Sequence, residues 1–351
     1  MNLIRFITYL FLVVSWRGGY AQTEHIQKFE PSLTFSAYLS SAAAGFDVYS
    51  KKRSARTDFP NTVEYAPNLK GGFGFDVSYR AIDLSIGFNE RLDPVTQKIF
   101  GESQYKALNF RFTGNRQLAF EVNLSRLQGF AIQNAAAYDN TLALEGVLPH
   151  RPDLTMNYAK IRTLFQFNPE KFSYRAAFAF SERQTKSAGS FFLNSHLYRQ
   201  NVYSTHSLIP DSIQGNFLNS DRLSDIKVYA LGLGPSYGYT LTNGSWFITP
   251  ILALGADIQF VEHKLDNVSQ GYKTEFAPML DFRFSMGYNG KRFFIALSSK
   301  SDINVIESRY FGITYSLNRT FLTLGYRFKE PKSLKYLYKQ IEKSFEDALR
   351  K

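Results

Sequence analysis

Apolar and polar residues alternate along two neighbouring stretches between Gly71 and Asn89, which read GGFGFDVSYRAIDLSIGFN. Every second residue of the first stretch is aromatic or aliphatic, and the residues between are small, polar or charged. The same alternation resumes after a reversal near Arg80. A period of two is that of a β-strand, so the pattern predicts two strands joined by almost no loop. It does not separate a soluble sandwich from a membrane barrel, because both have one apolar face and one polar face.

The alternation recurs along the chain and predicts about twelve strands. Four further pairs are expected at 106–126, 157–181, 227–262 and 273–302, with turns near 115, 169, 243 and 290. Single strands are expected within 31–50 and 309–328. In the last stretch the apolar residues are odd-numbered up to Leu317 and even-numbered from Leu322. We expect a β-bulge near Asn318 to shift the phase of one long strand, in preference to an extra turn.

Three features favour a barrel over a sandwich. Short turns alternate with long loops, of which 127–153 and 182–225 are the longest, as in outer-membrane barrels. Aromatic residues lie beside the short turns, where an interfacial girdle would be. Charges of both signs occupy mid-strand positions, which a wet lumen tolerates and lipid does not. The candidate interface aromatics are Tyr79, Tyr239, Trp246 and Tyr288, and the candidate lumen charges are Asp76, Asp83, Arg111, Glu121, Arg162, Arg175, Asp281 and Arg283.

The N-terminal residues are typical of a signal peptide. A short positive start with Arg5 is followed by an apolar run from Phe6 to Trp16 and a small-residue cleavage site ending at Ala21. The run is too short to span a bilayer as a helix. We therefore expect residues 1–21 to be removed, 22–329 to form the barrel, and the protein to reach the outer membrane of a Gram-negative bacterium.

The last residues, 330–351, follow a different period. Leu334, Tyr338, Ile341, Phe345 and Leu349 recur at helical spacing among lysines and glutamates. This predicts an amphipathic periplasmic helix after the last strand. We expect it to pack on its own barrel, with the inner leaflet or a periplasmic partner as alternatives.

The order of several motifs resembles an uncharacterised outer-membrane barrel family of Bacteroidota, a domain of unknown function. The resembling blocks are YAPNLKGGFGFDVSYR from Tyr65, ALNFRFTGNRQLAFEVNLSRLQGFAI from Ala107, GYNGKRFFIAL from Gly287, and LGYRF ending at Phe328. The resemblance covers most of the mature chain. The resemblance implies an outer-membrane location and an all-β fold, a single antiparallel up-and-down barrel. It implies no activity.

The net charge of the 351-residue chain is +11, and the chain has no cysteine. The basic residues are scattered and form no stripe, which disfavours a nucleic-acid partner. Absent cysteine excludes disulfides and thiolate metal sites. We expect outer-membrane lipid as the surroundings, and a periplasmic or surface partner at the tail or the long loops.

The sequence predicts no catalytic, cofactor or metal residues. Ser204 and His206 lie close together but in a predicted loop, and His196, His206 and Asp211 have no recognised metal spacing. The expected function is a barrel without evident catalysis, either a narrow channel or a structural or envelope-assembly component. The alternatives are a barrel-embedded hydrolase acting on lipid or polysaccharide, and a secreted β-sandwich binding protein.

Overall fold

The computed structural model describes residues 24–51, 60–69, 71–80, 82–90, 92–113, 116–139, 141, 146–217, 219–336 and 338–340. The expected signal peptide and the end of the tail, 341–351, lie outside these residues. Among the residues described, no helix is both long and apolar enough to cross a membrane.

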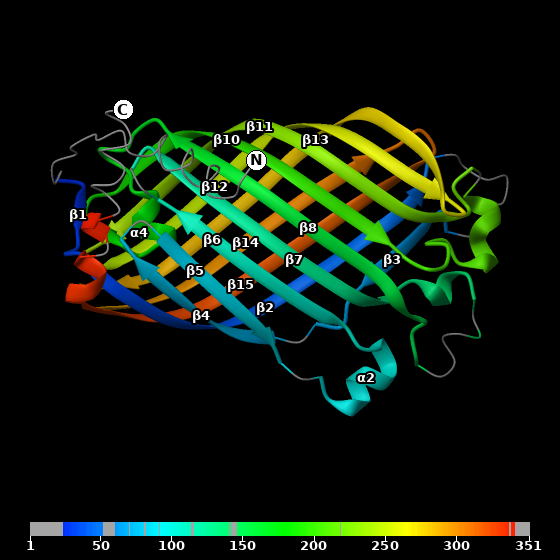
Figure 1. Ribbon diagram of the computed structural model, residues 1–351, viewed down its shortest axis with the longest axis horizontal. Coiled ribbons are helices and arrows are strands. Elements are labelled where there is room, and N and C mark those ends of the chain that lie inside the picture. The colour runs from blue at the N-terminus through cyan, green and yellow to red at the C-terminus, as the bar shows by residue number, and fades with distance from the viewer. Residues whose placement is uncertain are drawn as a thin grey trace.

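Thirteen strands of the described chain form one antiparallel sheet that closes on itself (Figure 1). Twelve of them follow one another round the ring, and the short β3 lies between β2 and β7 at one end of the barrel. The strands are β2 (Ser32–Ser50), β3 (Thr62–Ala66), β4 (Gly71–Tyr79), β5 (Ile82–Asn89), β6 (Gln104–Phe112), β7 (Leu118–Ile132), β8 (His150–Gln166), β10 (Ala188–Tyr203), β11 (Leu223–Asn243), β12 (Trp246–Leu265), β13 (Val268–Asn289), β14 (Phe293–Glu307) and β15 (Phe311–Lys329).

The remaining elements lie at the ends of the ring. They are the strands β1 (Ile26–Lys28) and β9 (Glu182–Gln184), which pair with each other, the helices α2 (Pro94–Phe100) and α4 (Tyr174–Phe178), and the 3-10 turns η1 (Ala135–Ala137) and η2 (Asp211–Asn216).

The barrel closes where β15 pairs with β2 along their whole lengths. The register runs from Phe311 opposite Ser50 to Lys329 opposite Ser32. Closure leaves no unpaired edge along this seam, which a strand within lipid requires. The predicted fold, an antiparallel barrel of about twelve strands, is confirmed, and the secreted sandwich is excluded.

Large apolar side chains cover the outside of the barrel. Phe276 is 71% exposed, Leu39 64% and Leu324 59%, and each belongs to the outward-facing set of its strand. Soluble proteins rarely leave so many apolar side chains in water, whereas a membrane barrel places them in lipid. With the closed ring, this exterior identifies an outer-membrane β-barrel.

Most short turns lie at one end of the barrel, which we take as periplasmic because outer-membrane barrels have short turns there. The expected alternation of short turns and long loops fails near the C-terminus. Only Asp266 and Asn267 separate β12 from β13, and both have positive φ. Asp and Asn tolerate the left-handed conformation, so this pair makes a tight hairpin where a loop was expected. Strands β11 to β13 are 20 to 22 residues long, longer than a bilayer needs.

The third expected strand pair is wrong in its second member. Residues after Phe167 do not return as a strand but turn into the lumen and form α4. The segment 168–187, here called the periplasmic plug, buries Phe172, Tyr174, Phe178 and Phe180. The strand that pairs with β8 is β10, inside the expected loop 182–225. The other long loop shrinks to 133–149 because β7 and β8 are longer than expected.

The expected bulge in the last strand is also wrong. Strand β15 keeps an unbroken register with both neighbours. Its odd-numbered residues face inward along the whole strand. They are apolar near the outer end because the interior there is apolar, and the even-numbered residues are apolar further on because they face lipid. Phe311, Ile313 and Leu317 are buried in an apolar cluster that fills the outer end of the lumen.

The described part of the tail, 332–336 and 338–340, is helical, as expected. It contacts the β4–β5 hairpin of its own barrel. Arg80 Nη2 lies 2.7 Å from Glu330 Oε1, and the Arg80 guanidinium stands 4.0 Å from the Tyr338 ring centroid.

Candidate functional site: a charged chamber inside the barrel

The inner wall carries a row of alternating charges on four consecutive strands. Asp83 on β5 is the register partner of Arg111 on β6, Arg111 of Glu121 on β7, and Glu121 of Arg162 on β8. Arg111 Nε donates to Glu121 at 3.1 Å, and its Nη1 stands 3.9 Å from Asp83. Opposite charges on neighbouring strands attract, so this half of the wall stabilises itself.

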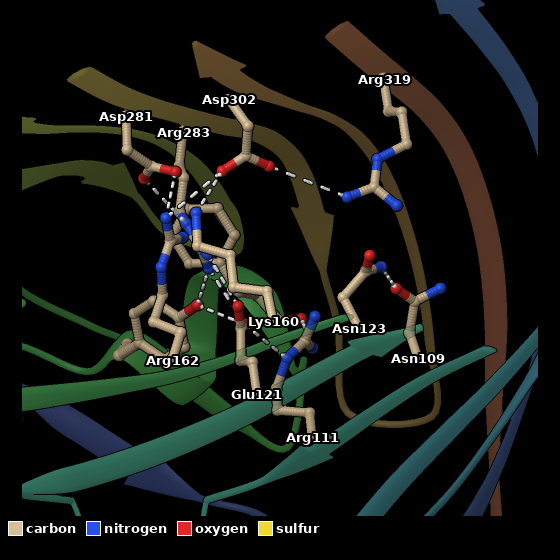
Figure 2. Close-up of polar contacts among 12 residues, drawn as sticks. Asn109, Arg111, Glu121, Asn123, Lys160, Arg162, Asp281, Arg283, Asp302 and Arg319 are labelled. Carbon is tan, nitrogen blue, oxygen red and sulfur yellow. Dashed lines mark hydrogen bonds and ion pairs between the residues drawn. The ribbon is translucent and has the colours of Figure 1, made fainter. Parts of the chain in front are cut away.

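The facing wall supplies two carboxylates that are register partners, Asp281 on β13 and Asp302 on β14. Arg162 reaches across the lumen and donates to both, and Lys160 Nζ lies 3.1 Å from Asp302 (Figure 2). The Arg162 side chain is 3% exposed. Two like charges side by side would repel, and the cations from β8 remove that repulsion.

Arg283 joins the two walls. Its guanidinium donates to Glu121 at 2.7 and 2.9 Å and to Asp281 at 3.3 Å. Tyr174 of α4 donates its hydroxyl hydrogen to Glu121 at 2.8 Å. The periplasmic plug is thereby bonded into the same network.

A cavity of about 140 Å³ lies beside this network, lined by charged and hydroxyl side chains of the wall and by Phe178 and Phe180 of the plug. A smaller cavity of about 40 Å³ adjoins it and shares Tyr38, Asn109, Arg319 and Phe321. Polar cavities of this size hold several waters. We call the larger cavity the chamber.

The structure places the eight candidate lumen charges inside the barrel. Asp76, Asp83, Arg111, Glu121, Arg162 and Arg283 line the chamber, and Asp281 bonds to Arg162 and Arg283. Arg175 belongs to α4 rather than to a strand. It lies 3.8 Å from Glu182 and donates to the Arg80 carbonyl at 3.2 Å.

The four candidate interface aromatics lie at the periplasmic rim. Trp246 is 61% exposed and Tyr239 38%. Trp246 and Tyr288 are register partners with ring centroids 5.5 Å apart. Tyr79 is half-buried and donates its hydroxyl hydrogen to Glu330 at 2.8 Å.

Sequence reasoning missed Lys160, Lys300, Asp302 and Arg319, all of which line the chamber. The signal for Lys300 and Asp302 was available, because the alternation of β14 continues past Ser298 and puts both on the inner face. Arg319 was hidden by the apparent phase change in β15.

Apolar side chains close the lumen on both sides of the chamber. The outer cluster includes Tyr65 of β3 and Leu208, Ile209, Ile213 and Phe217 of the loop between β10 and β11, all 2% exposed or less. On the periplasmic side Phe180 stacks on Phe294, with centroids 4.4 Å apart.

Hydrogen bonds hold the periplasmic plug in place. Asn289 Nδ2 donates to the carbonyls of Ala176 and Glu182, at 3.2 and 2.8 Å, and Arg327 donates to the Phe180 carbonyl. Arg116 and Glu182 form an ion pair of 3.1 Å, and each side chain is 3% exposed. The plug is therefore bonded to the barrel at several points.

The residues considered for hydrolysis do not assemble a catalytic group. Ser204 donates its hydroxyl hydrogen to the His206 backbone carbonyl, not to an imidazole. His196, expected in a loop, faces inward on β10, and its Nε2 lies 3.1 Å from Asp257 Oδ1. Both side chains are buried and outside the chamber lining. Within the described residues, no three His, Asp or Glu side chains gather as metal ligands.

A family model described as a domain of unknown function, DUF4421, matches residues 22–328. The chain belongs to this family. The resemblance of its motif blocks to a barrel family of unknown function is thus confirmed. No curated protein matches the DUF4421 chain.

Several solved outer-membrane structures are weakly similar to the DUF4421 chain. The protease OmpT from Escherichia coli has 8% identity and a TM-score of 0.35, covering 86% of this chain and 98% of its own. The COG4313 outer membrane channel from Pseudomonas putida F1 has 8% identity and a TM-score of 0.36, covering 89% of this chain and 99% of its own. The β domain of the Bordetella autotransporter BrkA has 12% identity and a TM-score of 0.35, covering 85% of this chain and 100% of its own. The protease, channel and autotransporter descriptions apply to those three proteins alone.

Proposed function

We propose that this protein is a closed, non-catalytic outer-membrane barrel, a structural component of the envelope that presents its outer loops and periplasmic tail to partners. The observation that carries this proposal is the double closure of the lumen. Apolar side chains pack across both ends of the chamber, and an ion-pair network crosses its middle.

Closure at two separate levels is what argues against a diffusion pore. A twelve-strand barrel is only moderately wider than the small barrels whose interiors side chains fill. Here the outer cluster and the plug each bury large aromatic residues, so a path for ions would require both to move. Buried aromatics make such a movement costly in free energy.

The test is conductance in planar lipid bilayers after insertion is verified by heat-modifiability on gels. Wild-type protein should give no steady conductance above that of bare lipid. Phe276→Ala, which changes a lipid-facing residue of β13, is the matched control and should behave the same way.

A second variant separates a closed barrel from a gated channel. Residues 170–181 are replaced by a short Gly-Ser linker, which removes α4 and leaves the outer cluster intact. The closed barrel predicts that this variant also fails to conduct. Ohmic conductance of the wild type, or of the linker variant alone, would refute the proposal and indicate a narrow channel instead.

A further inference from the structure

Three cations stand side by side on the inner wall of the chamber. Arg283 on β13 is the register partner of Lys300 on β14, and Lys300 is the register partner of Arg319 on β15. All three side chains line the chamber. Like charges directly opposite on neighbouring strands repel, so this row needs compensating negative charge.

The carboxylates of the protein compensate this row unevenly, and Glu121 attracts both Arg283 and Lys300. Arg283 has Glu121 and Asp281 within 3.3 Å. Arg319 has Asp302 at 3.9 Å, but that carboxylate is already bonded to Lys160 and Arg162. Lys300 forms no ion pair within 4.0 Å among the described residues.

Arg319 is also incompletely satisfied in hydrogen bonding. The residue is 9% exposed, and its buried Nε has no partner in the described structure. Figure 2 shows its guanidinium apart from the main network, with one contact to Asp302. A buried charged donor without an acceptor is costly, and a bound acceptor removes that cost.

The balance of charge in and around the chamber favours an anion. Five carboxylates line the chamber or bond to residues that do, namely Asp76, Asp83, Glu121, Asp281 and Asp302. Six cations line it, namely Arg111, Lys160, Arg162, Arg283, Lys300 and Arg319. The excess cation lies beside open volume rather than packed protein. Hydroxyl groups of Ser298 and Thr323 line the same space and can donate hydrogen bonds.

We propose that Lys300 and Arg319 form a binding site for a small oxyanion in the chamber. A tetrahedral or planar oxyanion would accept from the Lys300 ammonium and from the Arg319 guanidinium together, which suits the geometry of both donors. The proposal goes beyond the closed-barrel function and does not depend on it.

Arg319 lies where the two cavities meet. Its register partner on β2 is Ala42, a small residue. Within the described residues, 42–45 of β2 have no strand partner on the side away from β15, because pairing with β4 ends at Ser41 and pairing with β3 begins at Phe46. The smaller cavity lies along this interruption and meets the chamber at Arg319.

Inorganic phosphate is the probe for the test. Equilibrium dialysis with radiolabelled phosphate should show saturable binding of one phosphate per chain to the purified barrel in detergent, at constant ionic strength in sodium chloride. Lys300→Met and Arg319→Met should each weaken this binding at least tenfold, whereas Lys300→Arg should retain it. Lys291→Met, an exposed lysine in the β13–β14 turn, should bind as the wild type does.

Thermal unfolding provides a readout that separates binding from a structural role. Phosphate should raise the unfolding midpoint of the wild type and leave that of Lys300→Met unchanged. Without phosphate, Lys300→Met should be at least as stable as the wild type, since the change relieves repulsion. Absence of saturable binding, equal binding by wild type and variants, or a destabilised Lys300→Met in chloride would each overturn the proposal.

Discussion

Replacing Arg162 by methionine removes the cation that separates Asp281 from Asp302. Methionine keeps an unbranched chain as far as the position of Nε and lacks the rest of the guanidinium, so the change removes chiefly the charge and its hydrogen bonds. In the variant, the two carboxylates remain register partners on β13 and β14, with Lys160 and Arg283 as their nearest remaining cations. The variant therefore tests whether the network stabilises the barrel.

The expected loss of stability follows from the burial of this ion-pair network. Arg162 is bonded to both carboxylates, and its side chain is 3% exposed while those of Asp281 and Asp302 are 6% and 12% exposed. Removing one partner of a buried ion pair leaves an uncompensated charge and costs about 3–5 kcal/mol. We expect Arg162→Met to lower the free energy of unfolding by an amount in this range.

The assay is reversible urea unfolding in lipid vesicles, followed by tryptophan fluorescence. Trp246 is the only tryptophan outside the expected signal peptide, so the signal has one source. The matched control is Arg222→Ala, which breaks an ion pair of 2.7 Å to Asp266 at the exposed outer end. Exposed pairs contribute little, so the control should unfold as the wild type does.

Adding Asp281→Asn to Arg162→Met gives a double-mutant cycle. The neutral amide no longer repels Asp302, so part of the lost stability should return, with a coupling of about 0.5–3 kcal/mol. The reasoning is refuted if Arg162→Met unfolds at the same urea concentration as Arg222→Ala, or if the two network changes are additive.

Three further predictions concern the plug, the wall and the tail. Phe294→Ala should cost about 3–5 kcal/mol because the ring is 1% exposed and stacked on Phe180, whereas Phe293→Ala, lipid-facing and 50% exposed, should cost much less; urea unfolding of both variants tests this. Gly232→Ala should destabilise the barrel by about 1–3 kcal/mol and lower the folded fraction on unheated gels, because a Cβ there would overlap His196 and Asp257. Gly215→Ala, where a Cβ would meet no described atom within 4 Å, should have no such effect. Desolvation raises the pKa of Glu330, but hydrogen bonds from Arg80 and Tyr79 outweigh it and lower this pKa overall. Docking of the tail is therefore favoured above the ordinary glutamate pKa and is lost as the pH falls through the lowered pKa. Hydrogen exchange of the tail, corrected for intrinsic rates, should therefore increase at low pH in the wild type, and should already be high at neutral pH in Arg80→Ala.

Much of the barrel could be predicted from the sequence because period two identifies a strand whichever face meets lipid. The alternation around Phe73 and Phe293 gave both the strands and their faces. The same period misassigned Phe172 to Phe180, since alternate aromatics buried in a plug look identical to aromatics facing lipid. In both settings every second residue avoids water, and only the tertiary structure determines whether those residues face lipid or pack inside the barrel.

The candidate site was predicted in part for a related reason. Charges such as Arg162 and Asp281 stood out because they interrupt apolar strands at mid-length. Arg319 did not, because its neighbours Tyr315 and Leu317 are apolar and also face inward. The sequence predicted charges facing the lumen at mid-strand but not the apolar side chains that close the interior towards both ends. Which charges meet across the lumen depends on the register of every strand between them, and the alternation within single strands does not give that register.

Closure of the ring between β2 and β15 in the outer membrane is the central claim, and disulfide crosslinking tests it most directly. The chain has no cysteine, so introduced thiols report without background. Thr314 and Asp47 are register partners near the outer end, and partners in an antiparallel pair lie within disulfide range. Thr314→Cys with Asp47→Cys should crosslink within intact cells under mild oxidation. Thr314→Cys with Tyr49→Cys, offset by two residues, should crosslink far less. Equal crosslinking of both pairs, or of neither, would contradict the closed barrel.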